Sequence, residues 1–366
     1  MEFMDIKINK LSSFVDGLKK PLIIAGPCSA ESNEQLISTA RELKKNSINI
    51  FRAGIWKPRT RPNSFEGVGV KGLQWLNNVQ KEIGLKVMTE VANAKHVEQV
   101  LKHDIDMLWI GARTTVNPFA VQEIADALKG VDIPVFIKNP INPDMNLWLG
   151  AIERLSNVGC ENLVAVHRGF FSYGSKKYRN LPHWQLPVEL KRLIPNIPII
   201  CDPSHIAGSR DLIQSVSQKA IDLNFDGLMI ETHIDPDNAL SDKNQQITPS
   251  FLNNLLSELV VRHKSIDDKE FALSLEELRT KIDSLDNDLI NTLMNRMNIA
   301  ELIGKHKKEN DVTILQPLRW KYILENRTIN GIDSGLSKEF MTLLLRAIHQ
   351  ESINIQTGVM NNRKRK

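Results

Sequence analysis

The stretch PLIIAGPCS, residues 21–29, sets the pattern from which the fold of this chain is predicted. Its apolar, β-favouring run predicts a buried strand. A Gly-Pro pair ends that run, and Cys28 follows directly. The next segment, NEQLISTARELKKN at residues 33–46, carries apolar residues at helical spacing. The unit is therefore a strand, a short turn and a helix, with a thiol where the strand ends.

The same unit recurs along the chain to about residue 260, with helical stretches such as AKHVEQVLKH at 94–103 between the strands. Eight near-continuous hydrophobic strands, each followed by a helix, predict a parallel (β/α)8 TIM barrel. An open doubly wound sheet is the structural alternative, but its usual mark, G-x-G-x-x-G after the first strand, is absent. The seven later strand runs lie at residues 48–60, 86–92, 107–113, 134–140, 162–169, 198–205 and 227–235.

The pattern changes after the barrel, where strand signals end. SLEE at 274–277 fits a capping box, and apolar residues then follow at spacings of three and four, which predicts a helix from Ser274 to about Glu309. Pro317 favours the start of a second helix, and a third is predicted from about Ser337 to Gln356. We therefore predict a small all-α three-helix domain after the barrel. The predicted boundaries are 1–262 for the barrel, 263–273 for a linker, 274–360 for the helical domain and 361–366 for a disordered basic tail.

Composition limits the classes of function. Lys and Arg number 47 against 43 Asp and Glu, for a net charge of +4, which is too balanced for the strong basic stripe of a nucleic-acid-binding protein. Three cysteines do not form a disulfide framework, and the start MEFMDIKINK lacks the apolar core of a signal peptide. No apolar run approaches the roughly 18 residues of a membrane span. We expect a cytoplasmic protein with reduced thiols and neither nucleic acid nor membrane as partner.

Lysine and arginine recur where the predicted strands end, which is the face on which βα barrels carry their active sites. Solvated surface charge is the ordinary fate of these residues, but a common register on consecutive strands indicates that they converge on one mouth. Phosphate and carboxylate groups would neutralise them, so the mouth is predicted to bind a strongly anionic substrate. The six cations are Arg52, Lys57, Arg59, Arg113, Lys138 and Arg168.

A second group at the strand ends consists of Cys28, His205, Glu231 and Asp242. They come from the first, seventh and eighth strands, which become neighbours when the barrel closes. Each alone is more often a packed or paired residue, but a thiolate, an imidazole and two carboxylates together predict a divalent metal site. The other cysteines, Cys160 and Cys201, are interpreted as packing residues.

Several motifs resemble those of 3-deoxy-D-arabino-heptulosonate 7-phosphate (DAHP) synthase, the first enzyme of the shikimate pathway. They are AGPCSAES (25–32), FRAG (51–54) with KPRT (57–60), GAR (111–113), HRG (167–169), DPSH (202–205), and ETH (231–233) followed by ALSDKNQQ (239–246). The resemblance implies a metal-dependent condensation of phosphoenolpyruvate with erythrose 4-phosphate. It also implies one divalent ion, with manganese favoured over iron, cobalt or zinc.

The same resemblance assigns the site residues to the metal and to the two substrates. It places the metal on Cys28, His205, Glu231 and Asp242, phosphoenolpyruvate on Arg52, Lys57, Arg113, Lys138 and Arg168, and erythrose 4-phosphate on Pro58, Arg59 and Thr60. Lys138 is the predicted proton donor to the new hydroxyl, and Glu90 the predicted residue that orients the attacking water. The alternative is the sister 3-deoxy-octulosonate phosphate synthase, which has Ala-Asn in place of the Pro of KPRT and uses arabinose 5-phosphate.

The predicted helical domain carries cations on an apolar stripe. Arg296 and Lys307 are eleven residues apart, so they share one helix face, where burial is costly unless an anion meets them. Arg279 lies seventeen residues before Arg296, roughly 25 Å along the axis. If all three serve one small ligand, Arg279 must come from a second chain. A plain dimerisation module is the alternative.

ELRTKIDSLDNDLINTLMNRMNIAELIGKHK at 277–307 and ESINIQ at 351–356 resemble the all-helical chorismate mutase, an interlocked homodimer that converts chorismate to prephenate. Trp320 replaces a carboxylate of that family and Gln316 replaces a common Asp, which predicts reduced activity or a role as a sensor. The fused domain is also expected to supply feedback inhibition by chorismate or prephenate. The implied site comprises Arg279 of the partner subunit, Arg296, Lys307, Arg319, Ser352 and Gln356, with Lys307 and Gln356 stabilising the ether oxygen.

Overall fold

The computed structural model describes residues 4, 6–15, 20–57, 65–174, 177–262 and 269–361. The chain divides into two compact units, Met1–Lys264 and Ser265–Lys366. Within the described residues, no helix has both the length and the apolar character needed to cross a membrane.

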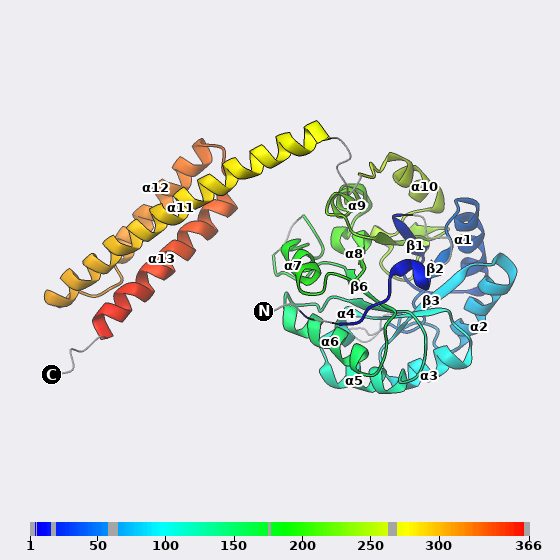
Figure 1. Ribbon diagram of the computed structural model, residues 1–366. Helices are drawn as coiled ribbons and strands as arrows, with labels where there is room; N and C mark the ends of the chain where they lie inside the picture. Colours follow the sequence, from blue (N-terminus) through cyan, green and yellow to red (C-terminus); the bar gives the residue numbers. More distant parts are fainter. Residues whose placement is uncertain are drawn as a thin grey trace. The chain divides into compact units, whose positions relative to one another are not determined.

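The first unit is a closed parallel barrel, which confirms the predicted fold (Figure 1). Each strand pairs with the next along the chain, and β1 pairs with β8 over five residues, so that Gly26 lies opposite Glu231. The first and last strands are therefore neighbours, as the sequence predicted. The strands are β1 Leu22–Gly26, β2 Ile50–Arg52, β3 Lys86–Val91, β4 Met107–Ile110, β5 Val135–Lys138, β6 Leu163–His167, β7 Ile199–Cys201 and β8 Gly227–Glu231.

Side chains alternate between the two faces of the strands and build two cores. The inner core fills the barrel with residues such as Ile24, Phe136 and Met229. The outer core joins the strands to the surrounding helices and includes residues such as Val135 and Leu228. Because successive side chains point to opposite faces, every second residue of a strand points into the barrel.

The barrel helices form a ring around the strands (Figure 1). Several begin at the polar caps their sequences offer: Ser32 accepts a hydrogen bond from the amide of Gln35, and Asn93 accepts one from that of His96. They are α1 Asn33–Lys45, α2 Lys71–Asn78 continued by η2 Val79–Ile83, α3 Ala94–Lys102, α4 Ala112–Thr115, α5 Pro118–Ala127, α6 Met145–Asn157, α7 Gln185–Leu193, α8 Pro203–Ala207, α9 Ile213–Asp222 and α10 Pro249–Glu258. Short helical turns are η1 Leu11–Ser13, η3 Arg210–Leu212, η4 Pro236–Asn238 and η5 Lys243–Gln245.

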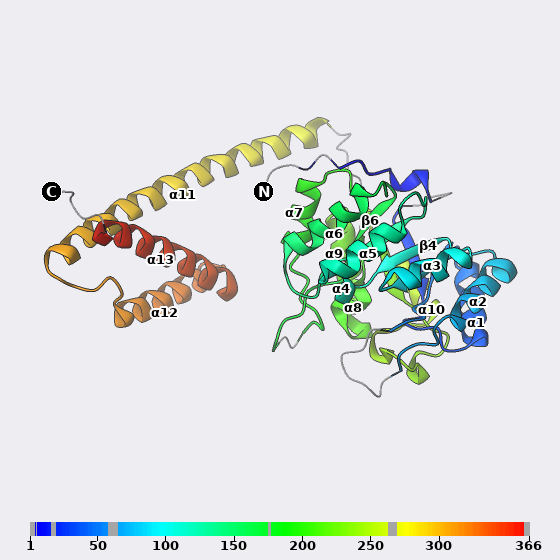
Figure 2. The same cartoon turned by 90° about the horizontal axis from the view of Figure 1, so that it is seen from below.

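The second unit consists of α11 Lys269–Glu309, α12 Pro317–Asp333 and α13 Lys338–Asn361. Helix α13 lies beside the second half of α11, and α12 packs against α13 (Figures 1 and 2). The first half of α11 has neither helix beside it, and its apolar residues, among them Ile282 and Leu285, are exposed in the single chain. The predicted start of the second helix at Pro317 is confirmed.

The predicted start of the first long helix at Ser274 is wrong. Helix α11 begins at Lys269 and runs without a break through residues assigned to the predicted linker. The preceding sequence KEFAL consists mainly of good helix formers, and a serine inside a helix costs too little to stop it. The capping-box pattern therefore does not mark the helix end here. Residues 263–268 of the predicted linker and residues 362–366 of the predicted tail lie outside the described residues, whereas Asn361 ends α13.

Candidate active sites

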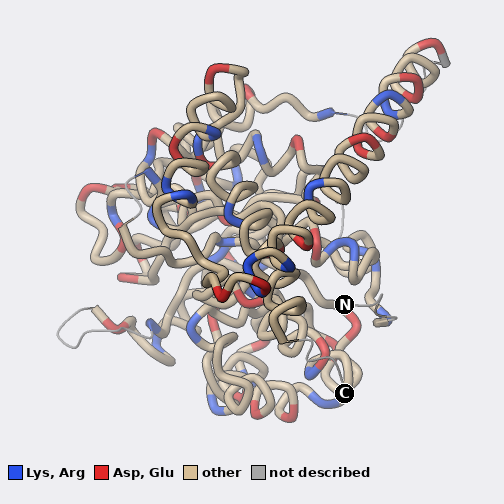
Figure 3. The backbone as a smooth tube through the Cα atoms, turned by 90° about the vertical axis from the view of Figure 1, so that its left-hand side faces the viewer, with Lys and Arg blue, Asp and Glu red and all other residues tan. Residues whose placement is uncertain are grey.

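On six of the eight barrel strands, the inward-facing position changes from apolar to charged at or just after the C-terminal end. Phe136 fills the barrel, and two residues later Lys138 points the same way; Met229 and Glu231 follow the same rule on β8. Positive and negative residues are interspersed over most of the tube in Figure 3. The barrel mouth differs, because charged side chains occupy the inward-facing position at the ends of several strands. These are Arg52, Glu90, Lys138, Arg168, Asp202 and Glu231.

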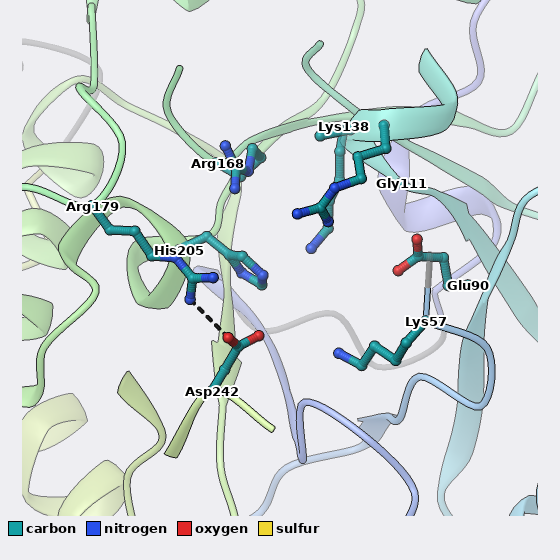
Figure 4. A pocket seen from close by; sticks show the side chains of 10 residues that line it. Lys57, Glu90, Gly111, Lys138, Arg168, Arg179, His205 and Asp242 are labelled. Atoms are coloured by element: carbon teal, nitrogen blue, oxygen red, sulfur yellow. Dashed lines mark hydrogen bonds and ion pairs between the residues drawn. The ribbon is translucent and has the colours of Figure 1, made fainter. Parts of the chain in front are cut away.

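These side chains surround a polar pocket (Figure 4). Four of the six predicted cations line it: Lys57, Arg113, Lys138 and Arg168. Arg52 is only 1 % exposed, and its Nη1 lies 3.4 Å from Glu231 Oε1. The predicted erythrose 4-phosphate contacts Pro58, Arg59 and Thr60 lie outside the described residues. The other residues of the pocket are Glu90, Gly111, Ala112, Arg179, His205 and Asp242.

The four predicted metal ligands gather at one side of this pocket. Donor atoms of Cys28, Glu231 and Asp242 lie within 4.8 Å of one another. His205 joins them through Nε2, which lies 3.7 Å from Glu231 Oε1. Glu231 Oε1 is buried and accepts no hydrogen bond within the described part of the chain. A buried carboxylate oxygen without a donor, beside a thiol and an imidazole, fits a divalent cation.

Gly26 explains why a cysteine can reach this site. Its φ of +145° belongs to glycine, and a Cβ at this position would lie 2.1 Å from the carbonyl oxygen of Arg52. The chain therefore passes close to β2 as it leaves β1. Cys28 then turns toward the mouth, where its sulfur donates to Asp242 Oδ2 at 3.0 Å.

Burial shifts the pKa of two side chains at the barrel mouth, Cys28 and Arg168. Burial, with Glu231 nearby, raises the pKa of the Cys28 thiol to about 12, although Lys57 Nζ, 2.7 Å from the sulfur, acts in the opposite direction. Burial lowers the pKa of Arg168 to about 10, which keeps the guanidinium charged at neutral pH. A thiol held in this way must lose its proton when it binds a metal ion.

Asp202 links two parts of the site. Its Oδ2 lies 2.8 Å from Lys138 Nζ and 2.8 Å from His205 Nδ1. Burial opposes the charged form, but His205 and Lys138 outweigh it and hold the pKa of the Asp202 carboxyl well below its ordinary value. Asp202 also caps α8 by accepting from the amide of His205. The carboxylate therefore fixes the imidazole and the ammonium together.

Glu90 is held on the opposite wall of the pocket. Its Oε2 accepts from Trp109 Nε1 at 3.0 Å. A Cβ on Gly111 would lie 2.1 Å from Glu90 Oε1, so only glycine leaves room for this carboxylate. The indole of Trp109 also lies under two cations, with its ring centre 4.8 Å from Arg52 Cζ and 5.7 Å from Lys138 Nζ.

The sequence interpretation gave several residues of this mouth no role. It placed Asp202 in the DPSH motif without a function and did not name Trp109. Trp109 on β4 and Asp202, directly after β7, continue the inward-facing register, so strict alternation would have indicated their direction. Arg179 and Gln245 come from the loops after β6 and β8, where no periodicity indicates direction.

The helical unit contains a second pocket, and five predicted residues line it: Arg296, Lys307, Arg319, Ser352 and Gln356. Arg296 Nη1 donates to Ser352 Oγ at 2.5 Å, and Lys307 Nζ donates to the carbonyl oxygen of Ile314 at 2.5 Å. Partial burial lowers the pKa of Arg296 and of Lys307.

Trp320 and Gln316 also line this pocket, together with His349. The rings of Trp320 and His349 stack with centres 3.9 Å apart. Arg279 lies elsewhere on α11, 3.5 Å from Glu276 Oε2. Since 28 residues of one continuous helix, about 42 Å, separate Arg279 from Lys307, Arg279 cannot reach the pocket of its own chain.

Two family models match the chain. The model of the DAHP synthetase I family matches residues 5–266, and that of chorismate mutase type II matches residues 278–357. The chain is 32 % identical over 237 residues to phospho-2-dehydro-3-deoxyheptonate aldolase of Thermotoga maritima, covering 65 % of this chain and 68 % of the relative. It is 30 % identical over 258 residues to 2-dehydro-3-deoxyphosphooctonate aldolase of Legionella pneumophila (strain Lens), covering 64 % and 88 %.

The fold comparison agrees. The crystal structure of the Thermotoga maritima DAHP synthase superposes with a TM-score of 0.58 at 32 % identity, covering 64 % of this chain and 67 % of that chain. A parallel barrel with a cation-lined mouth, together with these relatives, defines the first unit as a barrel enzyme of sugar-phosphate chemistry. The chain belongs to the DAHP synthetase I family and carries a chorismate mutase type II domain. Together the two domains make it a bifunctional enzyme of the shikimate pathway.

Proposed function

We propose that the barrel joins phosphoenolpyruvate, erythrose 4-phosphate and water into DAHP and inorganic phosphate in a metal-dependent reaction, while the helical domain rearranges chorismate to prephenate. The observation that carries the proposal is the barrel mouth, where buried cations face a metal-type donor set across one pocket. All three cysteines are free, as in the reducing cytoplasm, where we place both reactions.

The donor set Cys28, His205, Glu231 and Asp242 would hold the divalent ion, with manganese favoured. When bound there, the ion supplies Lewis acidity toward the aldehyde oxygen of erythrose 4-phosphate. The chain itself orients these donors: Asp202 Oδ2 lies 2.8 Å from His205 Nδ1 and holds the direction of the imidazole, and the sulfur of Cys28 lies next to Asp242.

The cations would bind the phosphate and carboxylate of phosphoenolpyruvate. Arg113 and Arg168 line the pocket beside Lys138, and Arg52 and Lys57 lie on the side of Cys28. A carbon–carbon bond forms between the enol carbon and the aldehyde carbon, water adds at C2, and phosphate leaves. We infer that Lys138, held by Asp202, donates the proton to the new hydroxyl. Glu90, held by Trp109, orients the attacking water.

The mutase reaction needs neither nucleophile nor metal, only a clamp on the two carboxylates and a donor to the ether oxygen. Arg296 and Arg319 would clamp the carboxylates, and Lys307 with Gln356 would serve the ether oxygen. We infer that a second copy contributes Arg279 and covers the exposed apolar residues of α11, so that the helical domain forms a homodimer. A groove between α11 and α13, lined by Ile290, Leu293, Met294 and Ile348, offers further apolar surface to the same partner.

One preparation tests both activities. Initial rates of DAHP formation and of chorismate loss are measured before and after chelation and again after Mn²⁺ is restored. Chelation should stop the first reaction and leave the second unchanged. A metal-free preparation with full synthase activity would exclude the metal role.

The acceptor is tested in the same assay by replacing erythrose 4-phosphate with arabinose 5-phosphate. The proposal expects turnover with the four-carbon aldehyde. Preferential turnover of the five-carbon sugar would instead favour the sister reaction, which is the activity named for the Legionella pneumophila relative.

The fused mutase domain would also let the end of the pathway control its beginning. We infer that chorismate or prephenate, bound between α11, α12 and α13, lowers the synthase rate. Synthase kinetics that do not change at saturating prephenate would remove this part of the proposal.

A further inference from the structure

Two consecutive glutamines, Gln245 and Gln246, contact two of the proposed metal ligands and have no role in the chemistry described above. Both are buried. Gln245 Nε2 donates to Glu231 Oε2 at 2.7 Å. Gln246 Oε1 accepts from the backbone amide of Cys28 at 2.9 Å, and its Nε2 donates to the carbonyl oxygen of Ser241 at 2.8 Å. One dipeptide therefore holds a ligand on β8 and the chain that follows β1.

Arg179 extends this arrangement to the third ligand. Its Nη1 donates to Asp242 Oδ1 at 2.9 Å (Figure 4) and to Gln245 Oε1 at 2.5 Å. A continuous series of contacts thus runs from Asp242 through Arg179 and Gln245 to Glu231. The two carboxylates of the donor set are connected without touching each other directly.

The backbone of Asp242 shows why such support is needed. Its φ of +48° lies in the left-handed region, which a residue other than glycine occupies only when its surroundings hold it there. This backbone conformation is uncommon outside glycine, and the side-chain contacts of Asp242 support it. The contact to Arg179 fixes one oxygen of Asp242, and the sulfur of Cys28 meets the other.

We propose that Arg179, Gln245 and Gln246 are positioning residues that set the donor atoms of Glu231, Asp242 and Cys28 before the metal arrives. The inference rests on the proposed function, because it takes these three residues as ligands. Each ligand oxygen that is fixed in advance loses less freedom when the ion binds, and removing such outer partners costs 10–100-fold in metal affinity in known sites.

The experiment measures Mn²⁺ binding to the metal-stripped full chain by calorimetry and by the paramagnetic resonance of free Mn²⁺. Arg179→Leu and Gln245→Leu should each weaken Mn²⁺ binding by about 10–100-fold. Arg179→Lys keeps one donor and should recover part of the loss. The side chain of Arg179 is 42 % exposed, so Arg179→Leu tests the idea with little disturbance of packing.

A matched control removes a cation of the same pocket that touches none of the three ligands. Arg168→Leu should raise the KM for phosphoenolpyruvate and leave Mn²⁺ affinity unchanged. For Arg179→Leu and Gln245→Leu, saturating Mn²⁺ should restore kcat without a change in that KM.

The outcomes distinguish a failure of the proposed metal role from a failure of the positioning role. If the wild-type chain binds neither Mn²⁺ nor Zn²⁺, the metal role in the proposed function fails, and this inference fails with it. If the wild type binds Mn²⁺ and both leucine variants bind it equally well, only the positioning role of Arg179 and Gln245 is overturned.

Discussion

The barrel mouth and the helical pocket are both lined by cations, but the two sites differ in how these cations are placed. In the barrel, buried charged groups form ion pairs inside a single chain, Arg52 with Glu231 and Lys138 with Asp202. In the helical unit, Arg296 and Arg319 line an open pocket and are exposed, and Arg279 is far along the same helix. The barrel completes its site within one chain, whereas the helical site, as proposed above, would need Arg279 from a second chain. The two activities should therefore respond differently to mutation and to dilution.

The largest expected effect is the loss of synthase activity, but not of mutase activity, when a proposed metal ligand is removed. Cys28→Ala removes a donor that neighbouring side chains cannot replace, since the remaining donors are already held in place. Lewis acidity contributes several kcal/mol, so we expect synthase kcat to fall by about a thousandfold. Rates of both reactions, measured on one preparation, check this.

The mutase rate of the same Cys28→Ala protein serves as the internal control and should stay at the wild-type value. A parallel loss of both activities in a folded protein would mean that the two sites are not independent.

The next prediction tests whether each mutase site takes residues from two chains. Lys307→Ala and Arg279→Ala should each lower mutase kcat by about a hundredfold or more, because a positioned charge is lost, and leave the synthase competent. Mixed after unfolding and refolding together, the two variants should regain about a quarter of wild-type activity, because half of the dimers then contain one intact site of two.

Mutase activity that does not recover on mixing would show that Arg279 acts within its own chain or not at all. Arg279→Ala mixed with wild type provides the reference for the refolding yield.

The smallest effect concerns Trp320, whose ring stacks on His349 within the helical pocket. Trp320→Glu introduces the carboxylate that the resemblance places at this position, and a hydrogen bond to a charged group is worth about 1.5–3 kcal/mol. We expect mutase kcat/KM to rise by roughly tenfold. Trp320→Phe keeps an aromatic ring and should leave the rate unchanged; an equal gain in both variants would assign the effect to pocket volume.

The sequence predicted the barrel well because its strands obey two strong rules. Each buried strand is a short apolar run, and each is followed by a helical pattern, so topology follows from order alone. Barrel closure then places Cys28 beside Glu231 without any knowledge of distances. Strand alternation explains why Lys138 and Arg168 point inward, whereas His167, one residue earlier than Arg168, joins an outer aromatic cluster with Trp184 and Phe225.

Loops and helix ends were less predictable for physical reasons. Arg179 lies in a loop whose direction depends on contacts with Asp242 and Gln245, which are more than sixty residues away in sequence. The start of α11 was misplaced because a capping box is a local preference worth about 1 kcal/mol, which continuous helix formers before Ser274 outweigh.

The pairing of β1 with β8 has a consequence for the timing of biosynthesis. Cys28 is synthesised early, but Asp242 is added 214 residues later, which takes roughly 10 to 40 seconds at about 5–20 residues per second. During that interval the proposed donor set is incomplete, because His205, Glu231 and Asp242 all follow Cys28 late in the barrel sequence. The barrel can therefore bring the four proposed metal ligands together only after its last strand and the loop that follows it have been synthesised.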